Sequence, residues 1–438
     1  MILFLLYLIV FSFIIWRSGW FSLAGIHRWF ILAGFWLKLL AGIAFWAVYS
    51  FHYGVEHGSD AFAYFDEGQM LHRVFYESPI DFFRLLFSTN PSDPVLQEYI
   101  APMDRWNRAV NYGVLNDNPT IIKFNALVMF FSGGYVHTHT LFMAFVSFSG
   151  LVLWYRFFTT WLTETPRLFL FAALILPPSL LFWGGGVMKE GLLIFGLGLL
   201  FFGIAELKNK NFKGVIWMLL ASFLLLFTKA YVLIAFAPAM LFLVLTIFGN
   251  PRHLALKFVG LHAVLFAFVL SLGLWVNDYN VFHMFQLKQK DFYNVSETQD
   301  ASSTVPIPPL NHWTDMILNA PTAIFNTYFR PHLLEANSLT FLISALENLF
   351  YLLLIAAAIV RFKRPRGDMA TMALFCLSCI IGLGLLIGLV TPVLGALVRY
   401  KIPALPFLVV LCGVVMHPTL ASLSLRLQTI IQPKQRKS

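Results

Sequence analysis

The sequence predicts an all-α polytopic membrane protein with about eleven transmembrane helices, and three observations support this prediction. Of its 438 residues, 59% are hydrophobic and only 12% are charged, whereas a soluble domain carries about 25% charged residues. The apolar residues form runs that approach the roughly 20 residues needed to cross a bilayer. The basic residues lie mainly in short gaps between these runs. The bilayer is therefore expected to be the main solvent of this chain.

The apolar runs define the expected spans in chain order. They cover residues 1–16, 29–51, 136–156, 168–184, 190–206, 214–228, 230–248, 258–276, 338–360, 370–391 and 402–418. The first run has no basic region before it and no small-residue cleavage site before Arg17, so we expect a retained helix rather than a signal peptide. The shortest paired runs also fit re-entrant hairpins that enter and leave the bilayer on one side.

Alternate gaps between the runs differ in charge, and this difference orients the chain. One set of gaps is rich in basic residues, namely Arg17, Arg28, Arg156, Arg167, Lys208, Lys210, Lys213, Arg252, Lys257, Arg361, Lys363, Arg364, Arg366, Arg426, Lys434, Arg436 and Lys437. The positive-inside rule places this set in the cytoplasm. We therefore expect a multi-pass protein of the plasma membrane (the bacterial inner membrane) with its N-terminus outside and its C-terminus cytoplasmic. Because the basic residues form no single patch, no nucleic-acid partner is expected.

The opposite side carries two long polar segments, residues 52–135 and 277–338, which hold most of the carboxylates. The first segment contains two apolar stretches that suit interfacial helices. In the second, residues 296–309 are rich in Ser, Thr and Pro, and they either order over a substrate as a lid or form a disordered connector. No linker divides the chain, so residues 1–438 are expected to form a single membrane domain that works at its outer face.

A group of carboxylates follows the second expected span. In a helix, Asp60, Tyr64 and Glu67 have i, i+4 and i+7 spacing and share one face, while Asp66 points about a third of a turn away. A carboxylate held just above the hydrocarbon edge is partly desolvated and suits a general base for a hydroxyl acceptor. The alternative is that Ser59 or Asp60 only caps the helix and the other carboxylates are solvated surface charges.

Basic residues at the outer turns are candidate phosphate ligands. Lys189 follows a turn of three glycines, residues 184–186, where backbone N–H groups can approach an anion closely. The other candidates at the same expected level are Lys229, Arg330, Arg399, Tyr400 and Lys401, with Tyr64 as a further substrate contact. Several converging cations would bind a phosphate, which Arg grips bidentately. Each of these residues also fits the commoner role of an interfacial anchor.

Two charged residues lie inside expected spans. Lys38 and Glu347 each sit about nine residues from a helix end, near the bilayer midplane at a rise of about 1.5 Å per residue. An unpaired charge is costly there, so we expect the two to form a structural ion pair. No metal site is expected from His137 and His139, because residues two apart on a helix face away from one another. The three cysteines all lie in apolar runs, which disfavours a disulfide framework or a zinc site.

The arrangement resembles the GT-C superfamily of polytopic glycosyltransferases, which take sugar from a polyprenyl-phosphate carrier. In that family an acidic residue lies in the first large outer loop, interfacial helices follow, and basic residues at later outer turns hold the carrier phosphate. Asp60 occupies the acidic position here, with Asp66 or Glu67 as the nearby second carboxylate. Residues 399–406, RYKIPALP, look like the R-Y-x-x-P-x-x-P entry to a late helix. The acidic loop follows the second expected span instead of the first, so the resemblance implies an extra N-terminal helix.

The resemblance implies a lipid-linked sugar donor at the outer leaflet and a glycan, lipid or protein hydroxyl as acceptor. Asp60 would deprotonate the acceptor, and the reaction would invert the anomeric centre. Lys189, Arg399 and Lys401 would neutralise the charge that builds on the departing phosphate. The expected partners are membrane lipids, the lipid-linked donor and the acceptor. No cofactor is required by these residues, although paired carboxylates could hold Mg²⁺ or Mn²⁺.

Two other functions remain compatible with the sequence, because fold analogy alone does not identify a function. A polysaccharide polymerase or ligase would use the same outer site with a lipid diphosphate donor, and its basic residues would matter more than its acid. A transporter or lipid-carrier flippase would need charged residues along a path through the bilayer, for which Lys38 and Glu347 are the clear candidates.

Overall fold

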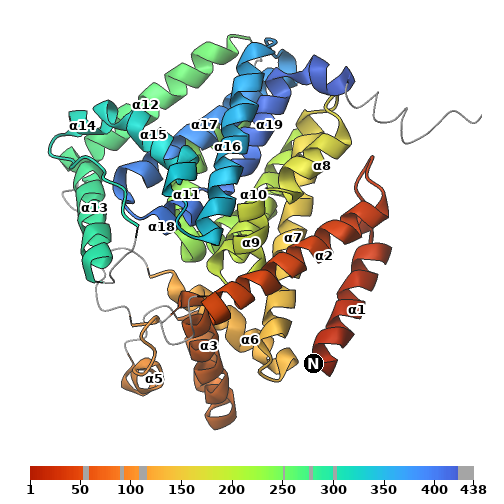
Figure 1. Ribbon diagram of the computed structural model, residues 1–438, viewed down its shortest axis with the longest axis vertical. Helices are drawn as coiled ribbons and strands as arrows, with labels where there is room; N and C mark the ends of the chain where they lie inside the picture. The colour runs from red at the N-terminus through yellow and green to blue at the C-terminus, as the bar shows by residue number, and fades with distance from the viewer. Residues whose placement is uncertain are drawn as a thin grey trace, which may run out of the picture. The chain divides into compact units, whose positions relative to one another are not determined.

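The computed structural model describes residues 1–52, 59–88, 93–107, 116–249, 252–275, 280–298 and 303–422. Across these residues the regular structure is helical, apart from one isolated β-bridge between Thr304 and Val393. Figure 1 shows these helices. The chain divides into two compact units. The first unit comprises Met1–Phe157 and Leu180–Ala230, and the second comprises Phe158–Ser179 and Tyr231–Ser438.

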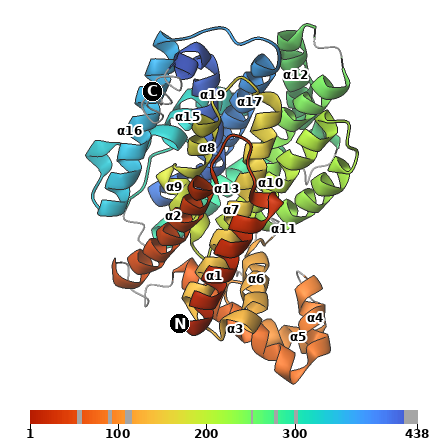
Figure 2. The same ribbon diagram turned by 90° about the vertical axis from the view of Figure 1, so that its right-hand side faces the viewer.

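The first unit contains the N-terminal helices and the first outer segment. Its elements are α1 (Ile2–Arg17), α2 (Arg28–Ala47) with a π-helical end (Val48–His52), α3 (Asp60–Glu77), α4 (Pro79–Phe87), α5 (Pro94–Ile100), α6 (Asn118–Ser132), most of α7 (Val136–Trp161), most of α9 (Pro178–Gly185), α10 (Lys189–Lys208) and the first part of α11 (Gly214–Phe248). Figure 2 shows α3, α4, α5 and α6 gathered at one end of this unit, with α1 lying alongside α7. The ring of Phe11 stacks on that of Phe145 at 4.3 Å between centroids, which joins α1 to α7.

Local sequence signals position the helices of the first outer segment. Ser59 caps α3, because its hydroxyl accepts a hydrogen bond from the N–H of Ala61. Pro occupies the first turn of α4, α5 and α6, where its missing N–H leaves no helical hydrogen bond unmade. Gly68 lets α3 approach α6 closely, since a Cβ there would come within 2.5 Å of the Cβ of Asn125. Leu71, Ile121 and Leu85 fill the core between these helices.

The second unit contains the remaining helices and a compact aromatic core. Its elements are α8 (Arg167–Ile175), the second part of α11, α12 (Leu254–Trp275), α13 (Val281–Thr298), α14 (Trp313–Leu318), α15 (Ala320–Phe329), α16 (Leu339–Val360), α17 (Gly367–Val390), α18 (Leu394–Tyr400) and α19 (Leu405–Val415). Phe407 of α19 packs edge-on against Phe236 of α11 and Phe375 of α17, each at 5.4 Å between ring centroids. The hydroxyl of Tyr328 donates to the carbonyl of Ile380 at 2.6 Å, which holds α15 against α17.

Eight helices in the described part of the chain are long and apolar enough to cross a membrane, or nine if the bent pair α8 and α9 forms one span. The expectation of a polytopic all-α chain is therefore confirmed at this coarser level, and the count of eleven stays a prediction. The first expected span is the shorter apolar helix α1. The runs 214–228 and 230–248 both belong to α11, which is interrupted by the non-helical backbone of Lys229 (φ −159°, ψ 77°).

Candidate functional site

Helix α3 carries the predicted carboxylates at the end of the first unit. Tyr64 and Glu67 are buried, at 2% and 5% exposed, whereas Asp66 is exposed to solvent. The Glu67 carboxylate accepts hydrogen bonds from the backbone N–H groups of Arg105 at 2.7 Å and Trp106 at 3.1 Å. Burial raises the pKa of Glu67, and the two N–H groups oppose that shift. In this arrangement Glu67 fixes the chain around Arg105.

Asp60 lies in the first turn of α3 with its carboxylate open to solvent. Ser59 makes the capping hydrogen bond, so the side chain of Asp60 is not needed as the helix cap. One Asp60 oxygen lies 3.4 Å from Nε of Arg105, and the two side chains are 40% and 32% exposed. A carboxylate that is partly exposed and held beside a guanidinium is accessible to a substrate hydroxyl.

Lys189 begins α10 and reaches into a polar cluster that we call the Lys189 cluster: Tyr64, Asp117, Asn118 and Lys189. Its ammonium donates to Oδ1 of Asp117 and to Oδ1 of Asn118, both at 2.7 Å. It also lies 5.4 Å from the centre of the Tyr64 ring. The hydroxyl of Tyr64 donates to the same Asn118 oxygen at 2.8 Å. The structure thus gathers two predicted residues, Tyr64 and Lys189, from α3 and α10.

The Lys189 cluster connects to Asp60 through Arg105. The side-chain amide of Asn118 donates to the carbonyl of Arg105 at 2.9 Å, and the guanidinium of Arg105 faces Asp60. Arg105, Asp117 and Asn118 were not predicted from the sequence. The usable signal was the polar stretch before Pro119, which marks the start of a helix, but nothing in that pattern pointed to Lys189.

Lys229, a predicted phosphate ligand, forms a buried ion pair within the first unit. Its ammonium donates to Oε1 of Glu190 at 2.6 Å, and the two side chains are 3% and 1% exposed. Glu190 directly follows Lys189 at the start of α10. The ion pair between Lys229 and Glu190 therefore holds α11, at the point where its helix is interrupted, against the start of α10. The hydroxyl of Thr120 adds a second tie by donating to the carbonyl of Phe227 at 2.5 Å.

The other predicted basic residues lie in the second unit. The guanidinium of Arg330 donates to Glu335, with 2.8 Å between Nε and Oε1. Lys401 is fully buried, and its ammonium donates to Oδ1 of Asn348 at 2.7 Å and to the carbonyl of Arg330 at 3.3 Å. These bonds give Lys401 a role in placing Arg330.

Arg399 and Tyr400 complete this group at the end of α18. The Arg399 guanidinium lies 5.9 Å from the centre of the Tyr400 ring. Tyr400 in turn packs near Tyr231 and Phe292, at 6.1 Å and 6.2 Å between ring centroids. Arg330, Arg399, Tyr400 and Lys401 belong to the second unit and the α3 carboxylates to the first. Their joint action on one substrate stays a prediction.

Lys38 and Glu347 each have hydrogen-bond partners within their own unit. The Lys38 ammonium, fully buried, donates to the carbonyl of Leu180 at 3.1 Å. Glu347 accepts from the backbone N–H of Ser179 at 3.1 Å and from the hydroxyl of Tyr351 at 2.6 Å. The ion pair between Lys38 and Glu347 stays a prediction.

The described residues contain no group of three or more His, Cys, Asp or Glu side chains that could hold a metal ion. The imidazole of His139 hydrogen-bonds to Oδ1 of Asn125 at 2.9 Å and to the hydroxyl of Ser132 at 2.8 Å, which ties α7 to α6. Binding of Mg²⁺ or Mn²⁺ by the α3 carboxylates stays a prediction.

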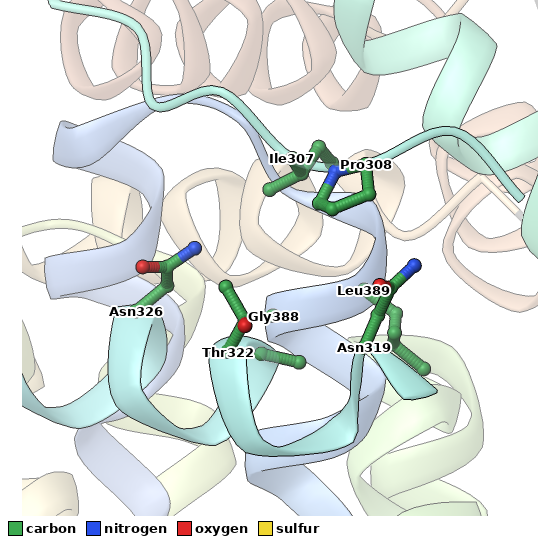
Figure 3. A pocket seen from close by; sticks show the side chains of 8 residues that line it. Ile307, Pro308, Asn319, Thr322, Asn326, Gly388 and Leu389 are labelled. Atoms are coloured by element: carbon green, nitrogen blue, oxygen red, sulfur yellow. The ribbon is translucent and has the colours of Figure 1, made fainter. Parts of the chain in front are cut away.

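Part of the segment 277–338 packs on α17, because the side-chain amide of Gln289 donates to the carbonyl of Leu389 at 3.0 Å. Tyr293 and Gln289 of α13 donate to the carbonyls of Ile307 and Pro308, both at 3.0 Å. Figure 3 shows Thr322 and Asn326 of α15, and Asn319 that precedes this helix, beneath these two residues, where they line a narrow crevice. Residues 299–302 of the expected lid lie outside the described residues. Closure of this segment over a substrate stays a prediction.

Lys123 of α6 offers a pH-dependent test of the packing at this end of the first unit. Its ammonium donates to the carbonyl of Ser88 at 2.5 Å and lies 5.3 Å from the centre of the Trp106 ring. Burial lowers the pKa of Lys123 from 10.5 to about 8. The charged amine is therefore disfavoured in the folded state, and this penalty disappears as the pH rises from about 8 to 10.5.

We expect the free energy of unfolding of the wild-type protein to rise across that pH window by at most about 3 kcal/mol more than that of the Lys123→Met variant. The measurement is the melting temperature of both proteins below and above pH 8. Lys213→Met, which removes an exposed lysine in the same unit, serves as the control and should leave the wild-type pH profile intact. Parallel profiles for wild type and Lys123→Met would contradict the prediction.

Comparisons with known proteins identify no relative of this chain. No family model matches the sequence, and no curated protein or solved structure shows significant similarity to it. The functional conclusion therefore depends on the geometry of Asp60, Arg105 and the Lys189 cluster.

Proposed function

We propose that this protein is a membrane glycosyltransferase that moves a sugar from a polyprenyl-phosphate carrier to a hydroxyl of a glycan, lipid or protein at the outer face of the plasma membrane. One observation carries the proposal. The partly exposed carboxylate of Asp60 faces Arg105, and Arg105 is hydrogen-bonded through Asn118 to Lys189, at the start of an apolar helix. An acid and two cations therefore lie close to the first turn of α10, a helix that is long and apolar enough to cross a membrane.

The proposed reaction uses Asp60 as the general base. The acceptor hydroxyl attacks the anomeric carbon of the donor sugar while its proton passes to the Asp60 carboxylate. The new glycosidic C–O bond forms as the bond between the anomeric carbon and the carrier phosphate oxygen breaks, and that phosphate leaves with the electron pair. Attack on the face opposite the leaving group inverts the anomeric centre.

Cations are needed to stabilise the negative charge on the leaving phosphate. The ion pairs of Arg105, Lys189 and Lys229 indicate which of these residues can do so. Lys189 and Lys229 are each matched by a carboxylate, Asp117 and Glu190, and both ammonium groups are buried. We assign these two lysines to positioning. Arg105 is partly exposed beside Asp60, and its fork-shaped guanidinium suits a phosphate monoester.

The same contacts favour a monophosphate donor over the lipid diphosphate of a polymerase or ligase. A diphosphate carries more negative charge and would call for more uncompensated cations, whereas two of the predicted basic residues in the first unit are already neutralised by acids. Transport would need charges along a path through the bilayer. Lys38 is the charged residue of the first unit that was predicted to lie within the bilayer. Its ammonium is buried and donates to the carbonyl of Leu180, which is a contact within the protein and does not favour a transport path.

The function is tested by deleting the gene in its own host and restoring it on a plasmid. We expect mass analysis of the surface glycans to show the loss of one sugar, and extracted lipids to show accumulation of a polyprenyl-phosphate sugar. The full-length chain should reverse both changes. Accumulation of an oligosaccharide on a lipid diphosphate would indicate the polymerase or ligase function instead. Unchanged glycans and lipid intermediates would contradict the proposal.

A further inference from the structure

A second site lies in the second unit, among the segments that the charge pattern places in the cytoplasm. It is a pocket of about 410 Å³. Its lining residues are Trp161, Thr246, Leu254, Arg364, Pro365, Arg366, Gly367, Asp368, Ala370 and Thr371. They come from the end of α7, the end of α11, the start of α12 and the segment that enters α17. Three separate basic gaps of the sequence thus meet at one cavity.

Two arginines give this pocket its positive charge. Arg364 and Arg366 both line it, and both side chains are exposed. Within the part of the chain that the structure describes, no carboxylate lies within ion-pair distance of either guanidinium. Asp368 is the acidic member of the lining and has an electrostatic or hydrogen-bonding contact of its own. The pocket therefore offers two guanidinium groups to an anion.

The surroundings of the pocket are apolar. Close in sequence to its lining residues, Phe248, Leu256 and Val360 are 62%, 71% and 83% exposed. The apolar part of α12, which begins at the pocket with Leu254, has no buried residue within the described chain. Large apolar side chains this exposed on a spanning helix face lipid tails, not water. A ligand in the pocket would therefore have its charged part at the arginines and hydrocarbon beside it.

We propose that this pocket binds the phosphate headgroup of an anionic phospholipid, with Arg364 and Arg366 holding the phosphate oxygens and the acyl chains lying along α12. Guanidinium groups bind phosphate through paired, charge-assisted hydrogen bonds, which are stronger than neutral ones. The pocket volume falls in the range typical of small-ligand sites, about 300–1,000 Å³. Basic pockets at the cytoplasmic ends of spanning helices are suited to anionic headgroups.

The alternative is general attraction of any cytoplasmic lysine or arginine to a negative membrane surface. The chain offers a matched control for this alternative. Arg361 and Lys363 lie on the same short segment and are also exposed, but they do not line the pocket. A diffuse surface effect should depend equally on the two pairs, whereas a pocket should depend on Arg364 and Arg366.

The test uses the full-length protein in nanodiscs of phosphatidylcholine, alone or mixed with phosphatidylglycerol, and counts bound phosphatidylglycerol by native mass spectrometry. Arg364→Gln with Arg366→Gln should weaken binding about tenfold or more, and Arg361→Gln with Lys363→Gln by less than about twofold. Arg364→Lys with Arg366→Lys keeps the charge and should bind between these limits. Melting temperatures verify that each variant is folded.

Three results would overturn the proposal. Equal losses in the two glutamine variants would mean diffuse attraction. Unchanged binding in Arg364→Gln with Arg366→Gln would place the lipid elsewhere. If inorganic phosphate alone displaced phosphatidylglycerol and raised the melting temperature as far as the lipid does, the pocket would be a site for free phosphate. Continued lipid binding in an Asp60→Asn protein would show that this site is independent of the proposed transferase reaction.

Discussion

Asp60→Asn is expected to lower the rate of sugar transfer by about 10²–10⁴-fold while the protein stays folded. Asparagine has nearly the same shape as aspartate but cannot take the proton of the acceptor hydroxyl. The side chain is 40% exposed and its contact with Arg105 is at 3.4 Å, so losing this ion pair should cost less than about 1 kcal/mol of stability. Ser59 provides the helix cap, which the substitution leaves intact.

The measurement is transfer from the lipid-linked donor in membranes that contain equal amounts of each variant. Glu77→Gln is the matched control, because it makes the same carboxylate-to-amide change on the same helix, at an exposed position at the opposite end of α3 from Asp60. It should keep most of the activity. Full transfer by Asp60→Asn would remove Asp60 as the base, and loss of transfer in Asp117→Asn alone would move that role to Asp117.

Lys229→Met is expected to give the largest loss of stability, about 3–5 kcal/mol in the free energy of unfolding. The substitution removes the cation that lies 2.6 Å from the Glu190 carboxylate, which is 1% exposed. Removing one partner of a buried ion pair is strongly destabilising. The non-helical backbone at Lys229 should also lose the contact that holds it in place.

The combined variant Lys229→Met with Glu190→Leu should recover most of that loss, because it removes both charges and keeps similar volumes. Denaturation of the purified protein in detergent measures all the variants. Lys213→Met, an exposed lysine in the same unit, should change the free energy of unfolding by no more than about 0.5 kcal/mol. If the combined variant were as unstable as Lys229→Met alone, the ion pair would not explain the effect.

The sequence by itself located the apolar helices, because burial in hydrocarbon demands continuous apolar runs that composition reveals directly. It also placed Asp60, Tyr64 and Glu67 on one helix face, since 3.6-residue periodicity acts within a single segment. The interruption of the long apolar run at Lys229 was visible as a lone charge between two apolar stretches, and the backbone of α11 departs from helical geometry at that residue.

Only the tertiary structure decided which polar groups meet. Asp117 and Asn118 lie about seventy residues before Lys189, and no periodicity links positions that far apart in the chain. The pairing of Lys229 with Glu190 and the burial of Lys401 depend in the same way on which helix faces pack together. Apolar runs specify that a helix is buried in the membrane, but the shapes of side chains at each crossing determine its neighbours and so the partners of its few charges.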